Sequence, residues 1–237
     1  MEWDVQTVAE TASTNADVAG AARSGAAEGL VIVADHQTAG RGRLNRSWES
    51  PAGSGLAASF LLRPLGLAPE RWPWIPLMAG LAVADAVLGV GLDPRLKWPN
   101  DVEVDGRKLA GLLVERVETP SGAAAVVGIG LNIAMTAEQL PIPTATSLRL
   151  QGVDVGRDTV LARLLDALGA RYEQLADEPG ALRDDYVAAC GTTDSPVRVT
   201  LPDGSELAGR ATDVDELGRL VVDGRPITAG DVVHVRA

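Results

Sequence analysis

The chain has 237 residues, enough for one or two domains with a substantial hydrophobic core. Its 21 Lys and Arg residues against 32 Asp and Glu residues give a net charge of −11, which disfavours a dedicated binder of duplex DNA or anionic membranes. The single cysteine, Cys190, has no partner for an internal disulfide, and the first ten residues do not resemble a secretion signal. We therefore expect a cytoplasmic protein.

The first half of the chain predicts strands and helices in alternation. Ser13 and Thr14 precede an alanine-rich segment and are suited to cap the start of a helix. Between residues 37 and 55 the apolar periodicity disappears, which predicts a long loop of the kind that usually has a function. The expected strands cover residues 3–8, 30–34, 56–62 and 95–98, and the expected helices cover 15–27 and 76–88.

A β-hairpin is the clearest local prediction. Asp105 and Gly106 form a two-residue turn signal between strands at 102–104 and 107–117. The uncharged stretch 119–137 contains Asn132 and glycines at 128 and 130, which favours a buried strand at 123–133 over a membrane span. Helices are expected at 157–176 and 181–189.

From Gly191 onward the pattern changes to short strands separated by glycine-containing turns. These strands, at 197–201, 206–214, 219–222 and 232–235, predict a small β-barrel that packs on the preceding domain. The sequence therefore predicts an α+β protein with a mixed, largely antiparallel sheet in residues 1–190 and a β-barrel in residues 191–237.

Residues 40–48, GRGRLNRSW, form a basic segment in an acidic chain. Arginine binds phosphate and carboxylate through paired hydrogen bonds, glycine lets the backbone approach a ligand, and tryptophan stacks on flat rings. The segment suits an adenylate or phosphate site, and a solvated or nucleic-acid-binding loop is the alternative. Because the segment is polar, we expect it to be mobile without ligand.

Lys108 lies directly after the hairpin turn. Strict alternation along its strand places Lys108 on one face with Ala110 and Leu112, and Gly111 on the other face. By position alone, an exposed hairpin lysine is the ordinary interpretation.

Four motifs in order, STN at 13–15, GRGRLNRSW at 40–48, KWPND with GRKLAG at 97–111, and GIGLN at 128–132, make the chain resemble the biotin protein ligases. The resemblance implies a class II synthetase-like catalytic domain followed by an SH3-like barrel. It also implies a monofunctional enzyme, since the first motif leaves no room for an N-terminal DNA-binding domain.

The resemblance implies that biotin and ATP form biotinyl-5′-AMP, from which biotin passes to a lysine of a biotin carboxyl carrier domain of an acyl-CoA carboxylase. Mg²⁺ is expected to bind through the phosphates, without a firmly assigned protein site. DNA and membranes are not expected as partners, and we expect a monomer or a weak homodimer.

Site residues follow from the same resemblance. The catalytic group comprises Lys108, Arg41, Arg43 and Asp101. Biotin is expected to contact Ser13, Thr14, Gln37, Arg41, Lys108 and Gly111. The nucleotide is expected to contact Arg43, Arg46, Trp48, Asn100 and Asn132.

Two alternatives stay open. A lipoate or octanoate ligase or transferase shares the general fold but lacks the GRGR loop coupled to KWPND. A non-catalytic nucleic-acid-binding module would leave Lys108 unexplained. Structural zinc is not expected, because Cys190, His36 and His234 lack ligand-like spacing.

Overall fold

The computed structural model describes residues 1–235, except for the side chain of Asn45. A seven-stranded sheet forms the larger part, in the order β1-β2-β3-β7-β6-β5-β4. Strands β1 and β2 are parallel and the other described neighbours are antiparallel, which confirms the predicted mixed sheet. The strands are β1 (Asp4–Thr11), β2 (Leu30–Gln37), β3 (Gly55–Leu62), β4 (Pro94–Lys97), β5 (Asp101–Val104), β6 (Arg107–Thr119) and β7 (Gly122–Asn132).

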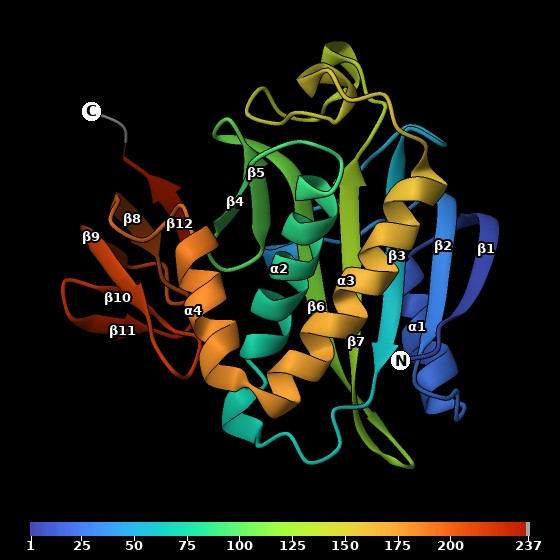
Figure 1. Ribbon diagram of the computed structural model, residues 1–237, viewed down its shortest axis with the longest axis horizontal. Helices are drawn as coiled ribbons and strands as arrows, with labels where there is room; N and C mark the ends of the chain where they lie inside the picture. The colour runs from blue at the N-terminus through green and yellow to red at the C-terminus, as the bar shows by residue number, and fades with distance from the viewer. Residues whose placement is uncertain (236–237) are drawn as a thin grey trace.

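Helices cover the two faces of this sheet unequally. On one face lie α2 (Trp74–Leu88) and α3 (Arg157–Asp177), with α4 (Pro179–Ala189) beside α2, while α1 (Thr14–Arg23) lies on the other face (Figure 1). Nearly all of α2 is apolar and buried. Because α1 is short, it covers only part of its face of the sheet, and the loop between β2 and β3 lies over the rest.

The β5–β6 hairpin forms as predicted, but it contains a bulge. Asp105 and Gly106 have φ of 51° and 68°, as a type I′ turn requires. Val102 pairs with Ala110, whereas Glu103 pairs with Lys108, so Leu109 is an extra residue in β6. A bulge restarts the alternation of side chains.

Because of this bulge, Lys108 and Gly111 face the same side of the sheet. A Cβ at Gly111 would lie 3.1 Å from Lys108 Nζ. The expectation from strict alternation, which put these two residues on opposite faces, is therefore wrong.

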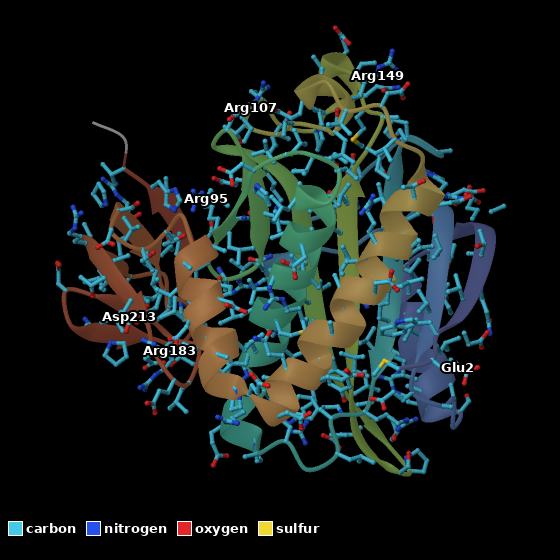
Figure 2. All side chains as sticks on the ribbon, in the orientation of Figure 1. Glu2, Arg95, Arg107, Arg149, Arg183 and Asp213 are labelled. Carbon is cyan, nitrogen blue, oxygen red and sulfur yellow. The ribbon has the colours of Figure 1, made fainter. Side chains whose placement is uncertain are left out.

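The C-terminal part is a five-stranded antiparallel sheet in the order β11-β10-β9-β8-β12. Its buried valines join the core of the larger part. Trp74 Nε1 donates to Glu216 O and Trp98 Nε1 donates to Gly218 O, and Arg183 of α4 bonds to Asp213 of β9 (Figure 2). The strands are β8 (Pro196–Thr200), β9 (Glu206–Val214), β10 (Leu220–Val222), β11 (Arg225–Ile227) and β12 (Asp231–His234).

The C-terminal sheet thus packs on the larger part, as expected, and the domain boundary at residue 190 stays a prediction. The short strand β11 was not predicted. Within residues 1–235, no helix is long and apolar enough to cross a membrane.

Candidate active site

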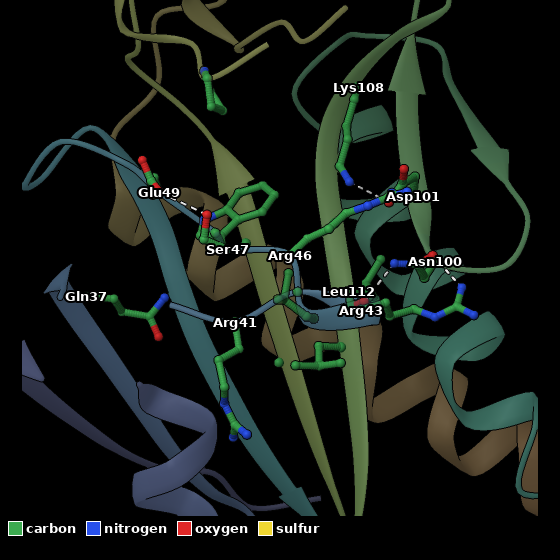
Figure 3. Close-up of a pocket in the computed structure, with 18 of the residues that line it drawn as sticks. Gln37, Arg41, Arg43, Arg46, Ser47, Glu49, Asn100, Asp101, Lys108 and Leu112 are labelled. Atoms are coloured by element: carbon green, nitrogen blue, oxygen red, sulfur yellow. Dashed lines mark hydrogen bonds and ion pairs between the residues drawn. The ribbon is translucent and has the colours of Figure 1, made fainter. Parts of the chain in front are cut away.

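All twelve residues assigned from the sequence line one cavity of about 530 Å³ (Figure 3). It lies on the α1 face of the sheet, between β6, β7 and the loop that follows β2. The residues are Ser13, Thr14, Gln37, Arg41, Arg43, Arg46, Trp48, Asn100, Asp101, Lys108, Gly111 and Asn132.

At one end of the cavity the side chains from α1 and β2 are polar and uncharged. The backbone N–H and the hydroxyl of Thr14 both donate to Gln37 Oε1, over 2.9 and 3.1 Å. These two bonds fix the orientation of the amide, and Nε2 is the donor that Gln37 offers to a ligand. Ser13 occupies the N-cap position of α1 as predicted, but its hydroxyl makes no capping bond, which leaves this buried group for the cavity.

Asn15 lies beneath this end and was not assigned from the sequence. Its Oδ1 is 2.6 Å from the hydroxyl of the fully buried Ser59, and its Nδ2 donates to Glu115 Oε2 over 2.8 Å. A Cβ at Gly128 would overlap the Asn15 amide, which explains one glycine of the GIGLN motif. We call Ser13, Thr14, Asn15, Gln37 and Ser59 the polar floor.

Trp48 covers the middle of the cavity. Gly111 and Gly130 are paired across β6 and β7, and the indole lies against both of them. A Cβ at Gly130 would overlap the Trp48 ring, so this strip of the sheet must lack side chains for the ring to lie there.

At the opposite end Lys108 points to Asp101, with 2.7 Å between Nζ and Oδ1 (Figure 3). Its ammonium lies 5.9 Å from the centre of the Trp48 ring. The Lys108 N–H donates to Thr144 O, and the Thr146 N–H donates to Lys108 O. The segment after β7 therefore fixes the position of this lysine.

Arg43 and Arg46 connect this end to the C-terminal sheet. Arg43 Nη1 donates to Asn100 Oδ1 over 2.9 Å and Arg46 Nη1 donates to Asp231 Oδ1 over 3.3 Å. Burial lowers the pKa of Arg43, with the nearby carboxylates acting against it, and the hydrogen bond to Asp231 raises the pKa of Arg46. Both side chains stay charged at neutral pH. We call Arg43, Arg46, Asp101, Lys108 and Asp231 the charged rim.

Arg41 and Asn132 line the cavity but do not belong to the charged rim. Arg41 extends away from Lys108 (Figure 3) and its Nη2 donates to Glu115 Oε2 over 2.9 Å. Asn132 is buried, and its Nδ2 donates to Thr146 O. It therefore supports the segment that holds Lys108, besides lining the cavity.

Sequence reasoning missed Asn15, Ser59, Glu115 and Asp231. Asn15 could have been found, because it belongs to the STN motif and its neighbour Gly128 belongs to the GIGLN motif. In the described part of the chain, no group of three or more His, Cys, Asp or Glu residues is arranged to hold a metal ion.

Comparisons with known proteins point to one family. The model of the "Biotin/lipoate A/B protein ligase family" matches residues 9–132, and that of the "Biotin protein ligase C terminal domain" matches residues 192–235. A biotin–[acetyl-CoA-carboxylase] ligase of Mycobacterium tuberculosis is 44% identical over 97% of this chain and 88% of its own length. A biotin–[acetyl-CoA-carboxylase] ligase of Paracoccus denitrificans is 34% identical over 92% of this chain and 93% of its own length.

Among solved structures, a biotin protein ligase from Aquifex aeolicus in complex with biotin and ATP superposes with a TM-score of 0.83. It is 26% identical, and 99% of each chain is covered. The chain therefore belongs to the biotin/lipoate A/B protein ligase family.

Proposed function

We propose that this chain converts biotin and ATP to biotinyl-5′-AMP and then transfers biotin to a carrier-domain lysine of acetyl-CoA carboxylase. The observation that carries this proposal is the division of one cavity into a polar floor and a charged rim. Biotin has the same polarity, with a neutral ureido ring at one end and a carboxylate at the other. Similarity to biotin–[acetyl-CoA-carboxylase] ligases over nearly the whole chain supports it.

In this proposal the ureido ring lies on the polar floor. Gln37 Nε2 and the buried hydroxyl of Ser13 meet the ureido group. The valeryl chain then runs toward Lys108 beside the Trp48 ring, which lies on the side-chain-free strip of Gly111 and Gly130. The carboxylate then reaches the charged rim.

In the first step a biotin carboxylate oxygen forms a bond to the α-phosphorus of ATP, and the bond to pyrophosphate breaks. Two anions must meet, so the main barrier is electrostatic. Lys108 and Arg43 offset the charge that develops on the phosphoryl oxygens. Asn100 holds Arg43 in place, and Arg46, Trp48 and Asn132 complete the nucleotide side.

In the second step the amine of the carrier lysine attacks the acyl carbon and AMP leaves. Asp101, the rim carboxylate nearest Lys108, is proposed to attract the protonated carrier lysine, which loses a proton to water before its neutral amine attacks. Asp101 and Asp231 are both ion-paired, so Mg²⁺ would be held mainly by the ATP phosphates with which it arrives. Mg²⁺ would neutralise phosphate charge there.

The polar floor favours biotin over lipoate or octanoate. Neither a dithiolane ring nor an alkyl chain would pair with Gln37 and Ser13, and an unpaired buried polar group costs about 1–3 kcal/mol. A nucleic-acid-binding role is disfavoured because Arg43 and Arg46 are bound to Asn100 and Asp231.

The test is ATP-dependent transfer of labelled biotin to a purified carrier domain, with octanoate and lipoate as competitors. We expect transfer that requires ATP and that neither competitor inhibits at concentrations near the KM for biotin. Transfer of octanoate in place of biotin would contradict the proposal. The cytoplasmic location, the oligomeric state and the mobility of residues 40–48 stay predictions.

A further inference from the structure

Glu115 lies beside the polar floor and has no role in the function proposed so far. Its Oε2 accepts two hydrogen bonds, one from Arg41 Nη2 over 2.9 Å and one from Asn15 Nδ2 over 2.8 Å. We propose that Glu115 is a positioning residue for biotin, which acts by holding the Arg41 guanidinium against the polar floor. This inference rests on the proposed function.

The Glu115 carboxylate is itself held in one orientation, because Asn15 is fixed on several sides. Asn15 Oδ1 lies 2.6 Å from the hydroxyl of Ser59, which is fully buried. Asn15 Nδ2 also donates to Leu113 O, and Gly128 leaves just enough room for the amide. Glu115 is therefore held firmly by the sheet, and its carboxylate fixes the position of Arg41 on the loop.

Arg41 needs such an anchor because its loop contains few apolar residues. Arg43 and Arg46 are anchored at the charged rim, through Asn100 and Asp231. Arg41 instead bonds to Glu115, which also accepts a hydrogen bond from Asn15 of the polar floor.

The direction of Arg41 also separates it from the phosphate chemistry. Glu115 lies four residues beyond Gly111 on β6, and a strand rises about 3.3 Å per residue, which makes roughly 13 Å along the strand. Lys108 contacts Gly111, whereas Arg41 bonds to Glu115. Arg41 thus lies beside the proposed site of the biotin ring and far from the reacting carboxylate. Loss of its bond to Glu115 therefore weakens biotin binding without slowing the chemical step.

The first experiment replaces Glu115 by Gln, which keeps its shape and removes its charge. We expect the KM for biotin in biotin-dependent pyrophosphate exchange to rise about five- to twentyfold, because one charge-assisted bond to a half-exposed arginine is weakened. The KM for ATP and kcat should change less than about twofold. The matched control is Glu118→Gln on the same strand, whose side chain is 74% exposed, and it should change nothing.

A double-mutant cycle with Arg41→Met separates positioning from general stabilisation. If Glu115 acts through Arg41, Glu115→Gln adds no further rise in the KM for biotin when Arg41 is already Met. Calorimetric titration with biotin alone should rank the wild type, the two single variants and the double variant in the same order as their KM values for biotin.

The inference is overturned if the two substitutions are additive, or if Glu115→Gln lowers kcat and leaves the KM for biotin unchanged. It is also overturned if Arg41→Met does not weaken biotin binding. Failure of the wild-type protein to bind biotin would instead overturn the proposed function.

Discussion

The two ends of the cavity differ in how their side chains are held. The polar floor is built from neutral groups on the sheet and at the start of α1, with Thr14, Asn15 and Ser59 buried and bonded to one another or to Gln37. The charged rim is assembled from a loop, a hairpin and the C-terminal sheet, with ion pairs that water can reach. A rigid neutral end suits recognition of one ring, and an adaptable charged end suits a reaction in which charge moves.

The largest effect should come from removing the rim lysine. Lys108→Met is expected to lower kcat for adenylate formation by about 100- to 1000-fold, because a cation used in the transition state is lost. Lys97→Met removes the chain's other lysine, whose ammonium pairs with Glu103 away from the cavity, and should cost less than about threefold. Pyrophosphate exchange measures both, and equal effects would contradict the assignment.

Retention of the intermediate should depend on Arg43. Arg43→Gly removes a phosphate donor and adds backbone freedom, so escape of biotinyl-5′-AMP should accelerate about ten- to a hundredfold. Rapid filtration measures this release, and labelling of bystander proteins should rise with it. Arg107→Gly at the hairpin tip is the control. Unchanged release from the Arg43 variant would place the anchor elsewhere.

Two glycines of β7 compare the polar floor with the middle of the cavity, where Trp48 lies. Gly128→Ala displaces the fixed Asn15 and should lower the free energy of unfolding by about 1–3 kcal/mol. Gly130→Ala displaces Trp48, which lies on a loop, so it should lower kcat about tenfold with a stability change below about 0.5 kcal/mol.

Denaturant unfolding and pyrophosphate exchange should be measured for both glycine variants. Gly180→Ala is the control, since nothing lies within 4 Å of its added Cβ. Equal losses of stability at positions 128 and 130 would show that the Trp48 loop is held as rigidly as the polar floor.

The smallest effect should come from the contact with the C-terminal sheet. Asp231→Asn weakens an ion pair to Arg46 that is largely exposed, and such pairs contribute at most about 1 kcal/mol. We expect the KM for ATP to change no more than about fivefold, with the KM for biotin unchanged. A change confined to the KM for biotin would contradict the division of the cavity.

Local sequence signals predicted most of the fold. The Asp105–Gly106 turn and the helical periodicity of residues 157–176 depend on neighbours in the chain, and both elements formed as expected. The bulge at Leu109 was missed because strict alternation allows no extra residue. Strand β11 was missed because Pro226 in its middle disfavours a strand.

The site was predicted where motifs named its residues and missed where distant segments meet. Glu115 continues an alternating strand and reads as an ordinary exposed residue, until Asn15 and Arg41 are brought to it by the fold. Arg46 and Asp231 are 185 residues apart, so no local pattern links them. Burial and partners of this kind are tertiary properties.

The division of labour is tested most directly by comparing Thr14→Val with Lys108→Met, using the biotin Kd from calorimetry and the single-turnover rate of adenylate formation. Thr14→Val leaves Gln37 without its hydroxyl donor, so the Kd should rise more than about tenfold while the rate stays within about threefold. Lys108→Met should do the reverse, with a Kd within about fivefold and a rate reduced more than about 100-fold. If both variants lose affinity and rate together, the two ends of the cavity do not have separate roles.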